Sequence, residues 1–285
     1  QMNKNPETTL ASYLAAHPFL EETAGLYQTL QSVLQEAVVP VEFPEVAACQ
    51  QLVKDGVPLL QQEKLQRAVV KVAAGMLPDV LAAFKGQQLP AAMAKALADW
   101  SVWAGETELQ EIQQFFTLLL KQQDEELAAF ITKVKLPKAS IRLVGWALID
   151  ALVPAELKDA QVWREAGWRE NYCPVCGRQP VMAQLKKETE ANGAERFLRC
   201  GGCGTLWHFT RIGCVYCGNK DTQKLPILLP EKGQVRIDTC DECHSYIKTY
   251  VGHGHEDIYL QDWATLHLDV LAEEKGLAKH GNVLI

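Results

Sequence analysis

Four C-x-x-C pairs between Cys173 and Cys243 constrain this chain more than any other feature. They hold eight of the nine cysteines, and the intervals between successive pairs are 23, 10 and 22 residues. The first two pairs are offset from the last two by 41, 41, 40 and 40 residues, which indicates an internal repeat. Each copy has two cysteine turns around a hairpin-length segment, which suits one tetrahedral four-thiolate ion. The sequence therefore predicts two ions, bound in sequential groups: Cys173, Cys176, Cys200 and Cys203, and then Cys214, Cys217, Cys240 and Cys243.

The turn within each pair has a recognisable chemistry. Two intervening residues let both sulfur atoms converge on one ion, at about 2.3 Å for zinc. A divalent ion with four thiolates carries excess negative charge, which backbone N–H groups of the turn can offset. The tight turn favours a positive φ after the second cysteine, where glycine is the least strained residue. Gly177, Gly204 and Gly218 occupy that position in three pairs, and His244, whose residue type tolerates positive φ, occupies it in the fourth.

Paired cysteines also occur as disulfides and as thioredoxin-type redox motifs. Disulfides require an oxidising compartment, and the chain has no recognisable secretory signal. A thioredoxin-type motif usually occurs once in a βαβ setting, whereas four pairs lie here among expected strands. Spacing and repetition therefore favour metal binding, in a reducing cytoplasm. Cys49 stands apart in an alanine-rich stretch and is expected to be a small buried side chain.

Residues 1–165 show helical periodicity and predict an all-helical, bundle-like domain. Asn5-Pro6 has the character of a cap followed by a first helical residue. One apolar stripe, which Pro78 is expected to cut or kink, runs through Leu65, Val69, Val72 and Met76.

The clearest helical pattern extends from Thr107 to about Lys135. Thr107 and Gln110 have capping-box spacing, and the apolar stripe is interrupted at Gln123. Such stripes are typical of core packing rather than of a cofactor site. Trp163 and Trp168 follow in the connector, where we expect them to pack the helical part against the next region.

From residue 172 onward the pattern changes to short extended segments with turn signals at Asn192-Gly193 and Pro230–Gly233. Each copy is expected to form a three-stranded ribbon too small to fold alone. Four-thiolate binding supplies roughly 10–16 kcal/mol in comparable zinc modules. The expected strands are 180–188, 195–199 and 205–212 in the first copy, and 222–229, 235–239 and 245–251 in the second.

The chain is therefore expected to have an α+β multidomain fold, with an all-helical domain before two rubredoxin-like (zinc-ribbon-like) β modules. A C-terminal helix is expected from Asp262 to Lys275, with its apolar residues inward: Leu266, Val270 and Leu271. His253 and His255 lie in a glycine-rich loop, where metal binding and simple solvation both fit. The expected parts are 1–165, 172–212, 213–251 and 252–285.

Charge and hydropathy argue against two classes of protein. No apolar run approaches the roughly 18 residues that a membrane span needs, so we expect no membrane insertion. The net charge is −7, yet residues 171–250 carry 11 basic and 8 acidic residues, a local balance of +3. That region is far from the dense basic stripe of a nucleic-acid interface, so no nucleic-acid partner is expected.

The combination of a helical half with these cysteine pairs resembles the FdhE family of formate dehydrogenase accessory proteins. The resemblance is specific over roughly 172–282 and weaker before it. His244 departs from it, as does the ending Asn282–Ile285. The residues that carry it are Cys173-Pro174-Val175-Cys176-Gly177, Arg199-Cys200, Cys203, Trp207-His208, Arg211, Cys214, Cys217, Cys240-Asp241-Glu242-Cys243, Tyr246, Lys248, Asp262, Ala264-Thr265-Leu266, Leu268-Asp269 and Gly276, with His17-Pro18 fitting more loosely.

The resemblance implies a cytoplasmic accessory protein that binds the catalytic subunit of a respiratory formate dehydrogenase and helps that enzyme mature. It implies iron, whereas the residues alone fit two mononuclear iron or zinc ions equally. We expect no enzyme, since no catalytic constellation is recognisable. The alternatives are a rubredoxin-like electron carrier or thiol-redox protein and, less favoured, a nucleic-acid-binding zinc ribbon. Trp207, His208 and Arg211, in the link between the modules, are either packing residues or partner contacts.

Overall fold

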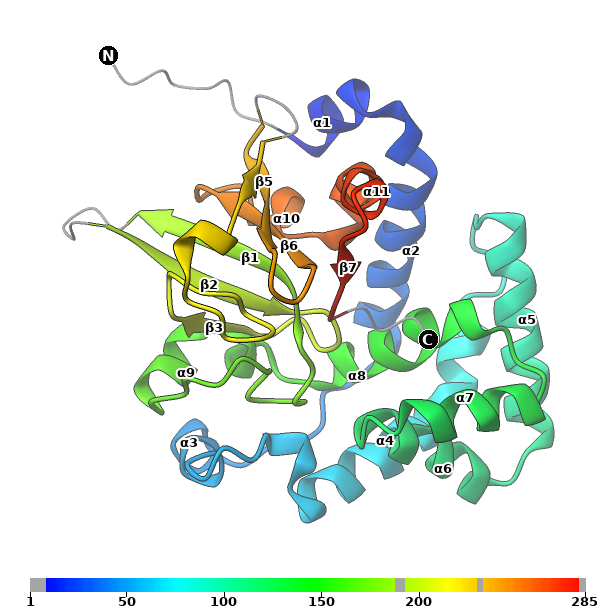
Figure 1. The fold of residues 1–285 in the computed structure, drawn as a ribbon. Coiled ribbons are helices and arrows are strands. Elements are labelled where there is room, and N and C mark those ends of the chain that lie inside the picture. The colour runs from blue at the N-terminus through cyan, green and yellow to red at the C-terminus, as the bar shows by residue number, and fades with distance from the viewer. Residues whose placement is uncertain (1–8, 188–192, 230–232, 282–285) are drawn as a thin grey trace.

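The computed structural model describes residues 9–187, 193–229 and 233–281. A mixed β-sheet occupies one side of the molecule, and the C-terminal helices lie against it (Figure 1). The N-terminal helices lie beside these C-terminal helices and below the sheet (Figure 1). The α+β fold class expected from the sequence is confirmed. Four expectations fall outside the described residues: the helix start at Asn5-Pro6, the Asn192 side of one turn, most of the Pro230–Gly233 turn, and the ending Asn282–Ile285.

Residues 9–165 form helices joined by loops and short 3-10 turns, as their apolar periodicity predicts. Helix α4 continues through Pro78 rather than ending there. Cys49 is fully buried, as expected, and its thiol contacts the carbonyl oxygen of Pro44. The helices are α1 (Leu10–Ala16), α2 (Glu21–Ala37), α3 (Val46–Leu52), α4 (Glu63–Ala83), α5 (Ala91–Glu106), α6 (Leu109–Leu120), α7 (Asp124–Lys133), α8 (Ala147–Leu152), which follows a π-helical turn, and α9 (Ala160–Glu165).

The single long helix expected from Thr107 to Lys135 is wrong. The chain forms α6 and α7 instead, and Gln122 between them has a φ of 55°. The expected capping box is also wrong, because Thr107 ends α5 and Glu108 precedes α6 without a side-chain cap. At this break, the Gln122 side chain donates a hydrogen bond to the carbonyl oxygen of Cys176, 3.2 Å away in the first cysteine turn.

Both copies of the repeat contribute to one sheet, in the order β3-β2-β1-β6-β5-β4, with β7 paired to β6. The joining pair is β1 with β6, which run parallel, with Met182 opposite Lys248 and Leu185 opposite Val251. The cysteine spacing alone does not predict this pairing. The strands are β1 (Pro180–Lys187), β2 (Ala194–Cys200), β3 (Leu206–Phe209), β4 (Ile227–Leu228), β5 (Val235–Cys240), β6 (Ser245–Val251) and β7 (Ala278–Lys279).

The two faces of the sheet are covered by different parts of the chain. The larger hydrophobic core joins the helical half to one face, and it contains Trp163, Trp168 and Trp207. The expectation that Trp163 and Trp168 pack the helical part against the metal region is therefore confirmed. A second core covers the opposite face, where α11 (Leu266–Glu274) packs on β6 through Leu268.

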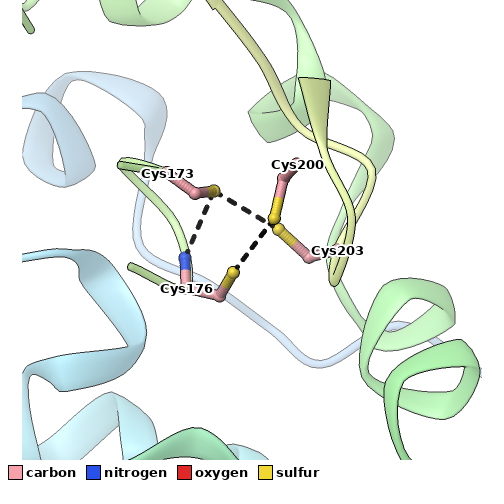
Figure 2. A group of neighbouring side chains, drawn as sticks. All are labelled: Cys173, Cys176, Cys200 and Cys203. Atoms are coloured by element: carbon pink, nitrogen blue, oxygen red, sulfur yellow. Dashed lines mark hydrogen bonds between the residues drawn. The ribbon is translucent and has the colours of Figure 1, made fainter. Parts of the chain in front are cut away.

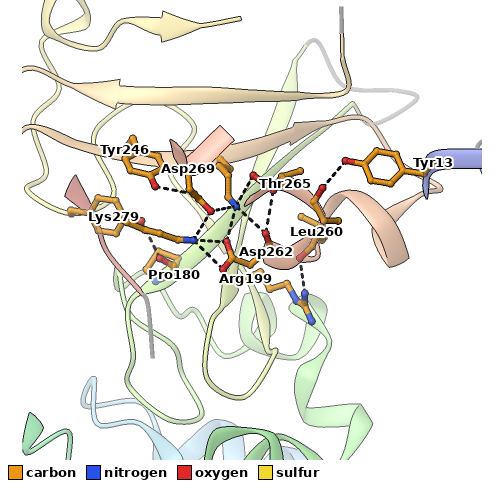
Figure 3. A network of polar contacts seen from close by, with 12 residues as sticks. Tyr13, Pro180, Arg199, Tyr246, Leu260, Asp262, Thr265, Asp269 and Lys279 are labelled. Atoms are coloured by element: carbon orange, nitrogen blue, oxygen red, sulfur yellow. Dashed lines mark hydrogen bonds and ion pairs between the residues drawn. The ribbon is translucent and has the colours of Figure 1, made fainter. Parts of the chain in front are cut away.

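Three charged side chains are buried between β6 and the C-terminal segment, and a fourth, Lys279, is half-buried beside them (Figure 3). Lys248 is 1% exposed, and its Nζ lies 2.8 Å from Asp262 Oδ1 and 2.9 Å from Asp269 Oδ2. Lys279 Nζ contacts the same two carboxylates at 2.8 and 2.9 Å, and the Tyr246 hydroxyl donates to Asp269. Burial acts to lower the pKa of Lys279, but the two carboxylates raise it. Two cations thus balance two anions in a site from which water is excluded.

This network corrects the expected orientation of the C-terminal helix. Leu266, Val270 and Leu271 were expected to face inward, but all three are exposed, at 39%, 54% and 38%. Leu268 and Asp269 face the sheet instead. The ion pairs of Asp269 with buried lysines outweigh the apolar preference of the opposite stripe, since an unpaired buried charge costs several kcal/mol.

The first described helices pack on the C-terminal segment. The Tyr13 hydroxyl donates a 2.6 Å hydrogen bond to the carbonyl oxygen of Ala264 (Figure 3). The ring of Tyr27 stacks on Trp263. The four-part division expected from the sequence stays a prediction, and contacts of this kind cross its boundaries. Among the described residues, no helix has both the length and the apolar character needed to cross a membrane.

Replacing Lys248 with methionine should lower the free energy of unfolding by about 3–5 kcal/mol, because two carboxylates would stay buried with one lysine between them. Urea denaturation followed by circular dichroism would measure the change. The matched control is Arg67→Met on α4, where the side chain is 78% exposed. It should change stability by less than about 0.5 kcal/mol. Equal stability of the Lys248→Met protein and the wild type would contradict the role given to the network.

Candidate metal centres

The first predicted group of cysteines converges on one point (Figure 2). Cys173 and Cys176 lie on the turn before β1, and Cys200 and Cys203 lie on the turn after β2. The Sγ atoms of Cys173 and Cys203 are 3.5 Å apart, and those of Cys176 and Cys200 are 3.3 Å apart. All four sulfur atoms lie within 4.8 Å of one another, and all four residues are buried.

The second group repeats this arrangement in the other copy. Cys214 and Cys217 lie in the link after β3, and Cys240 and Cys243 lie on the turn between β5 and β6. The Sγ atoms of Cys214 and Cys243 are 3.6 Å apart, and those of Cys217 and Cys240 are 3.7 Å apart. The structure thus brings together the two sequential groups that the repeat predicted.

Both groups fit a four-thiolate metal ion. A tetrahedral site with metal–sulfur bonds of about 2.3 Å has sulfur–sulfur edges of about 3.8 Å. The contacts of 3.3–3.7 Å are close to that edge and far longer than a disulfide bond of about 2.05 Å. All eight cysteines are free thiols. Each group could hold one ion with four protein ligands.

The backbone of the cysteine turns has the two features expected from the sequence, which are N–H groups near the sulfur atoms and a positive φ after each pair. The N–H of Gly202 lies 3.3 Å from Cys200 Sγ, and that of Tyr216 lies 3.4 Å from Cys214 Sγ, so amides offset thiolate charge in both groups. A positive φ follows the second cysteine of every pair, as expected: Gly177 (84°), Gly204 (69°), Gly218 (75°) and His244 (52°).

The first group is built into the core that joins the two halves of the chain. The N–H groups of Leu59 and Leu60 donate to the carbonyl oxygens of Pro174 and Val175, at 3.0 and 2.8 Å. The turn between Cys200 and Cys203 lies against the helical half, since a Cβ added to Gly202 would come within 2.7 Å of the Trp146 ring. Sequence reasoning missed these contacts, because the spacing of residues far apart in the chain gives no sign of them.

The second group has a different environment. Cys214 and Cys240 are buried, Cys217 is exposed and Cys243 is half-buried. A cavity of about 400 Å³ borders this group, and Cys214 and Cys240 form part of its wall. The two sites therefore share their ligand set but differ in access, with the first enclosed by protein and the second open at one ligand.

Protonation of the thiols opposes metal binding in both groups. Burial raises the pKa of the Cys173 and Cys176 thiols well above the ordinary range. Burial acts in the same direction on Cys200, but hydrogen bonds from the three neighbouring thiols lower its pKa. In Cys240 the turn's own N–H groups overcome burial and lower the pKa to about 7. Binding of an ion to either group would therefore have to release the protons of the thiols whose pKa is raised.

The three candidate partner contacts, Trp207, His208 and Arg211, differ in burial and in their contacts. Trp207 is fully buried, and its indole N–H donates to the carbonyl oxygen of Glu170, which fits the packing alternative. His208 Nε2 lies 3.6 Å from Glu195 Oε1. Burial lowers the pKa of His208 despite this carboxylate. Arg211 is exposed and lies at the cavity beside the second cysteine group. Of the three, Arg211 is the residue best placed for a partner contact, which stays a prediction.

The two loop histidines do not join either cysteine group. Within the described residues, the groups with metal-ligand geometry contain cysteines only. His255 precedes the short helix α10 (Glu256–Tyr259), where its ring lies edge-on to Tyr259.

Losing one ligand in the enclosed site should affect more of the molecule than losing one in the open site. Cys176→Ser and Cys217→Ser should each reduce the metal content from two ions to one. Cys176→Ser should also lower the melting temperature of the helical signal at 222 nm substantially more, because its turn lies in the shared core. Equal melting temperatures in the two variants would contradict this difference between the sites.

A chelator should remove the two ions at different rates. The second ion should leave first, because the exposed Cys217 gives the chelator access to the site. Metal release from the wild type, followed with a coloured chelator, should be biphasic, and Cys217→Ser should lack the fast phase. Loss of the slow phase in that variant would reverse the assignment of the open and enclosed sites.

Comparisons with known proteins match the part of the chain that contains both cysteine groups to FdhE proteins. The family model described as the FdhE central domain matches residues 172–211, and the model for the FdhE C-terminal domain matches residues 212–285. The Protein FdhE homolog of Shewanella sp. (strain MR-4) is 29% identical over 257 residues, covering 79% of this chain and 81% of that protein. The Protein FdhE homolog of Aquifex aeolicus (strain VF5) is 39% identical over 117 residues, covering 39% of this chain and 40% of that protein.

A solved structure shares the fold over nearly the whole chain. The crystal structure of the FdhE protein from Pseudomonas aeruginosa aligns with a TM-score of 0.62 and 21% identity, covering 94% of this chain and 88% of that chain. At that identity the likeness establishes the fold. Together, the comparisons show that residues 172–285 match the two FdhE domains and that this chain is similar to FdhE proteins over most of its length, which supports its membership in the FdhE family.

Proposed function

We propose that this protein is a cytoplasmic, metal-binding accessory protein that supports the maturation of a respiratory formate dehydrogenase by binding its catalytic subunit. The observation that carries the proposal is the pair of four-cysteine groups, each with a complete set of protein ligands. The partner class comes from the resemblance to formate dehydrogenase accessory proteins.

Closed metal sites suit an accessory role better than metal-assisted hydrolysis. Catalytic zinc sites keep a coordination position for water or substrate, whereas structural sites take all four ligands from the protein. Each group here already offers four sulfur atoms within 4.8 Å of one another. The ions would thus hold the cysteine turns in place and would not need to bind a substrate. We propose two mononuclear ions per chain, iron or zinc.

A second candidate function is electron transfer through the open site. If the second group holds iron, the exposed Cys217 provides a short path from the ion to a docked partner. The visible absorption spectrum of protein purified without added zinc distinguishes the two functions. Ferric four-thiolate iron is coloured and bleaches on reduction, whereas zinc is colourless. Reversible bleaching at one site would favour the electron carrier.

Charge distribution supports a partner surface in the metal region. The chain carries a net charge of −7, but residues 171–250 carry 11 basic and 8 acidic residues. An acidic partner would therefore be oriented toward this region, and its association should weaken as salt screens the attraction.

The metal-loaded chain should retain the separately expressed catalytic subunit of a formate dehydrogenase in a pull-down assay. Retention should fall as ionic strength rises from about 0.05 to 0.5 M, since the Debye length shortens several-fold over that range. A rubredoxin at matched metal content is the control bait, because it offers a four-thiolate site without the helical half.

Two results would count against the proposal. Equal retention by the rubredoxin would show that the four-thiolate site alone is recognised. No retention of the subunit, together with tight binding of nucleic acid, would replace the accessory function with that of a nucleic-acid-binding ribbon.

A further inference from the structure

The cavity beside the second cysteine group has the size of a ligand site. Its volume of about 400 Å³ falls within the roughly 300–1,000 Å³ typical of ligand pockets. It is lined by β5 and β6, by the link that carries Arg211 and Ile212, and by the segment leading into β4. The same face of the first repeat copy is filled, because the helical half packs on Leu198 and Trp207 there.

The internal repeat shows what is missing at this end of the sheet. By position in the repeat, β4 of the second copy corresponds to β1 of the first. Strand β1 pairs with β2 on one side and, in parallel, with β6 on the other. Strand β4 pairs with β5 only, so its second edge has no strand partner among the described residues. An extended segment could pair with β4 as β6 pairs with β1.

The charged side chains around the cavity indicate which charge such a segment would carry. Asp238 is the one acidic side chain among the described lining residues, and it already pairs with Arg236 at 2.7 Å. Arg196 is buried and donates to the carbonyl oxygens of Thr210 and Gly213, at 2.8 and 2.7 Å. Its guanidinium is therefore already engaged inside the protein.

Arg211 is exposed at the mouth of the cavity, and its guanidinium lies beside Gly193, just before β2. No residue that the structure describes forms an ion pair or hydrogen bond with it. A carboxylate of a bound ligand could pair with the Arg211 guanidinium. Such a charge-assisted hydrogen bond is stronger than one between neutral groups.

Apolar side chains surround the same mouth. Ile212 and Ile227 line the cavity and are 56% and 48% exposed, and Leu229, just after β4, is 75% exposed. Large apolar side chains gathered beside an unpaired strand edge are typical of a protein interaction site. Within the described residues, the rim thus combines a strand edge without a strand partner, an apolar surface and the exposed Arg211.

We propose that this cavity binds an extended peptide segment of a partner protein, in which an acidic side chain next to an aliphatic one pairs with Arg211 and the aliphatic side chain enters between Ile212 and Ile227. The identity of the partner rests on the proposed function, whereas the chemistry of the segment does not. Specificity would come from the side chains and much of the affinity from backbone hydrogen bonds to β4.

A library of random octapeptides tests the chemistry without assuming a partner. The metal-loaded wild type should enrich peptides that contain Asp or Glu beside Leu, Ile or Val. A selected peptide should lose about tenfold in affinity when its acid is changed to the amide, as expected for a charge pair worth about 1.4 kcal/mol. Enrichment of peptides without an acid, or no enrichment, would overturn the proposal.

Matched variants locate the site. Arg211→Glu and Ile227→Asp should each weaken the selected peptide about tenfold or more, for loss of the charge pair or of the apolar contact. The controls make the same changes elsewhere, Arg67→Glu on α4 and Val270→Asp on α11, both exposed. Both controls should bind within about twofold of the wild type. Metal content and circular dichroism of all four variants should match the wild type, since all four substituted side chains are exposed. Equal weakening by the controls would overturn the location.

A pull-down of the intact formate dehydrogenase catalytic subunit separates this inference from the proposed function. Retention by the wild type but not by Arg211→Glu would support both. Retention by the wild type and by both rim variants would overturn the cavity as the docking site and leave the proposed function intact. No retention by the wild type would overturn the proposed function, and the peptide library alone would then decide whether the cavity binds acidic segments.

Discussion

The packing of the helical half against the sheet depends on the first cysteine group, in which four buried sulfur atoms lie close together. They belong to Cys173, Cys176, Cys200 and Cys203. The turns that carry them lie in the same hydrophobic core as the helices, and one turn accepts backbone hydrogen bonds from the segment before α4. The Cys173 and Cys176 thiols are hard to ionise without a cation, because burial raises the pKa of both. Binding of an ion here would therefore be coupled to folding of the turns and to packing of the helical half.

The second copy of the repeat uses the same ligands in different surroundings. The helical half covers the first copy, while the second copy keeps one exposed cysteine and a cavity along its sheet. This asymmetry follows from the topology, in which β1 and β6 pair and β4 stays at an edge. A duplicated module can thus divide its roles, one copy stabilising the fold and the other facing solvent. Peptide binding at the open copy and electron transfer through it would both make use of that exposure.

The buried ion network has a comparable part in placing the C-terminal helix. Each of the two lysines, Lys248 and Lys279, forms ion pairs with both Asp262 and Asp269 (Figure 3). The Tyr246 hydroxyl also donates a hydrogen bond to Asp269. Such a network adds little net stability compared with an apolar core of equal volume, but a shifted helix would leave charges unpaired at a large cost. The network therefore favours one position of α11 over its alternatives. That position in turn creates the surface on which Tyr13 and Tyr27 dock the N-terminal helices.

Much of the metal chemistry was determined by the sequence itself. The two-residue interval, the following glycine or histidine and the 40–41-residue offsets predicted the grouping of all eight cysteines and the positive φ values after them. These are local constraints, since each turn is shaped by its own few residues. The helical stripes and the packing role of Trp163 and Trp168 were predictable for the same reason.

The remaining features were decided by contacts between distant parts of the chain. The parallel pairing of β1 with β6, the break at Gln122 and the inward side of α11 each depend on a partner that local spacing does not reveal. Asp269 is the clearest case, because a carboxylate in an amphipathic pattern is expected to face solvent, yet Lys248 and Lys279 stabilise it inside. The difference in access between the two metal sites has the same origin. Identical ligand spacing specifies identical coordination, but burial of each site depends on which other elements pack over it in the folded chain.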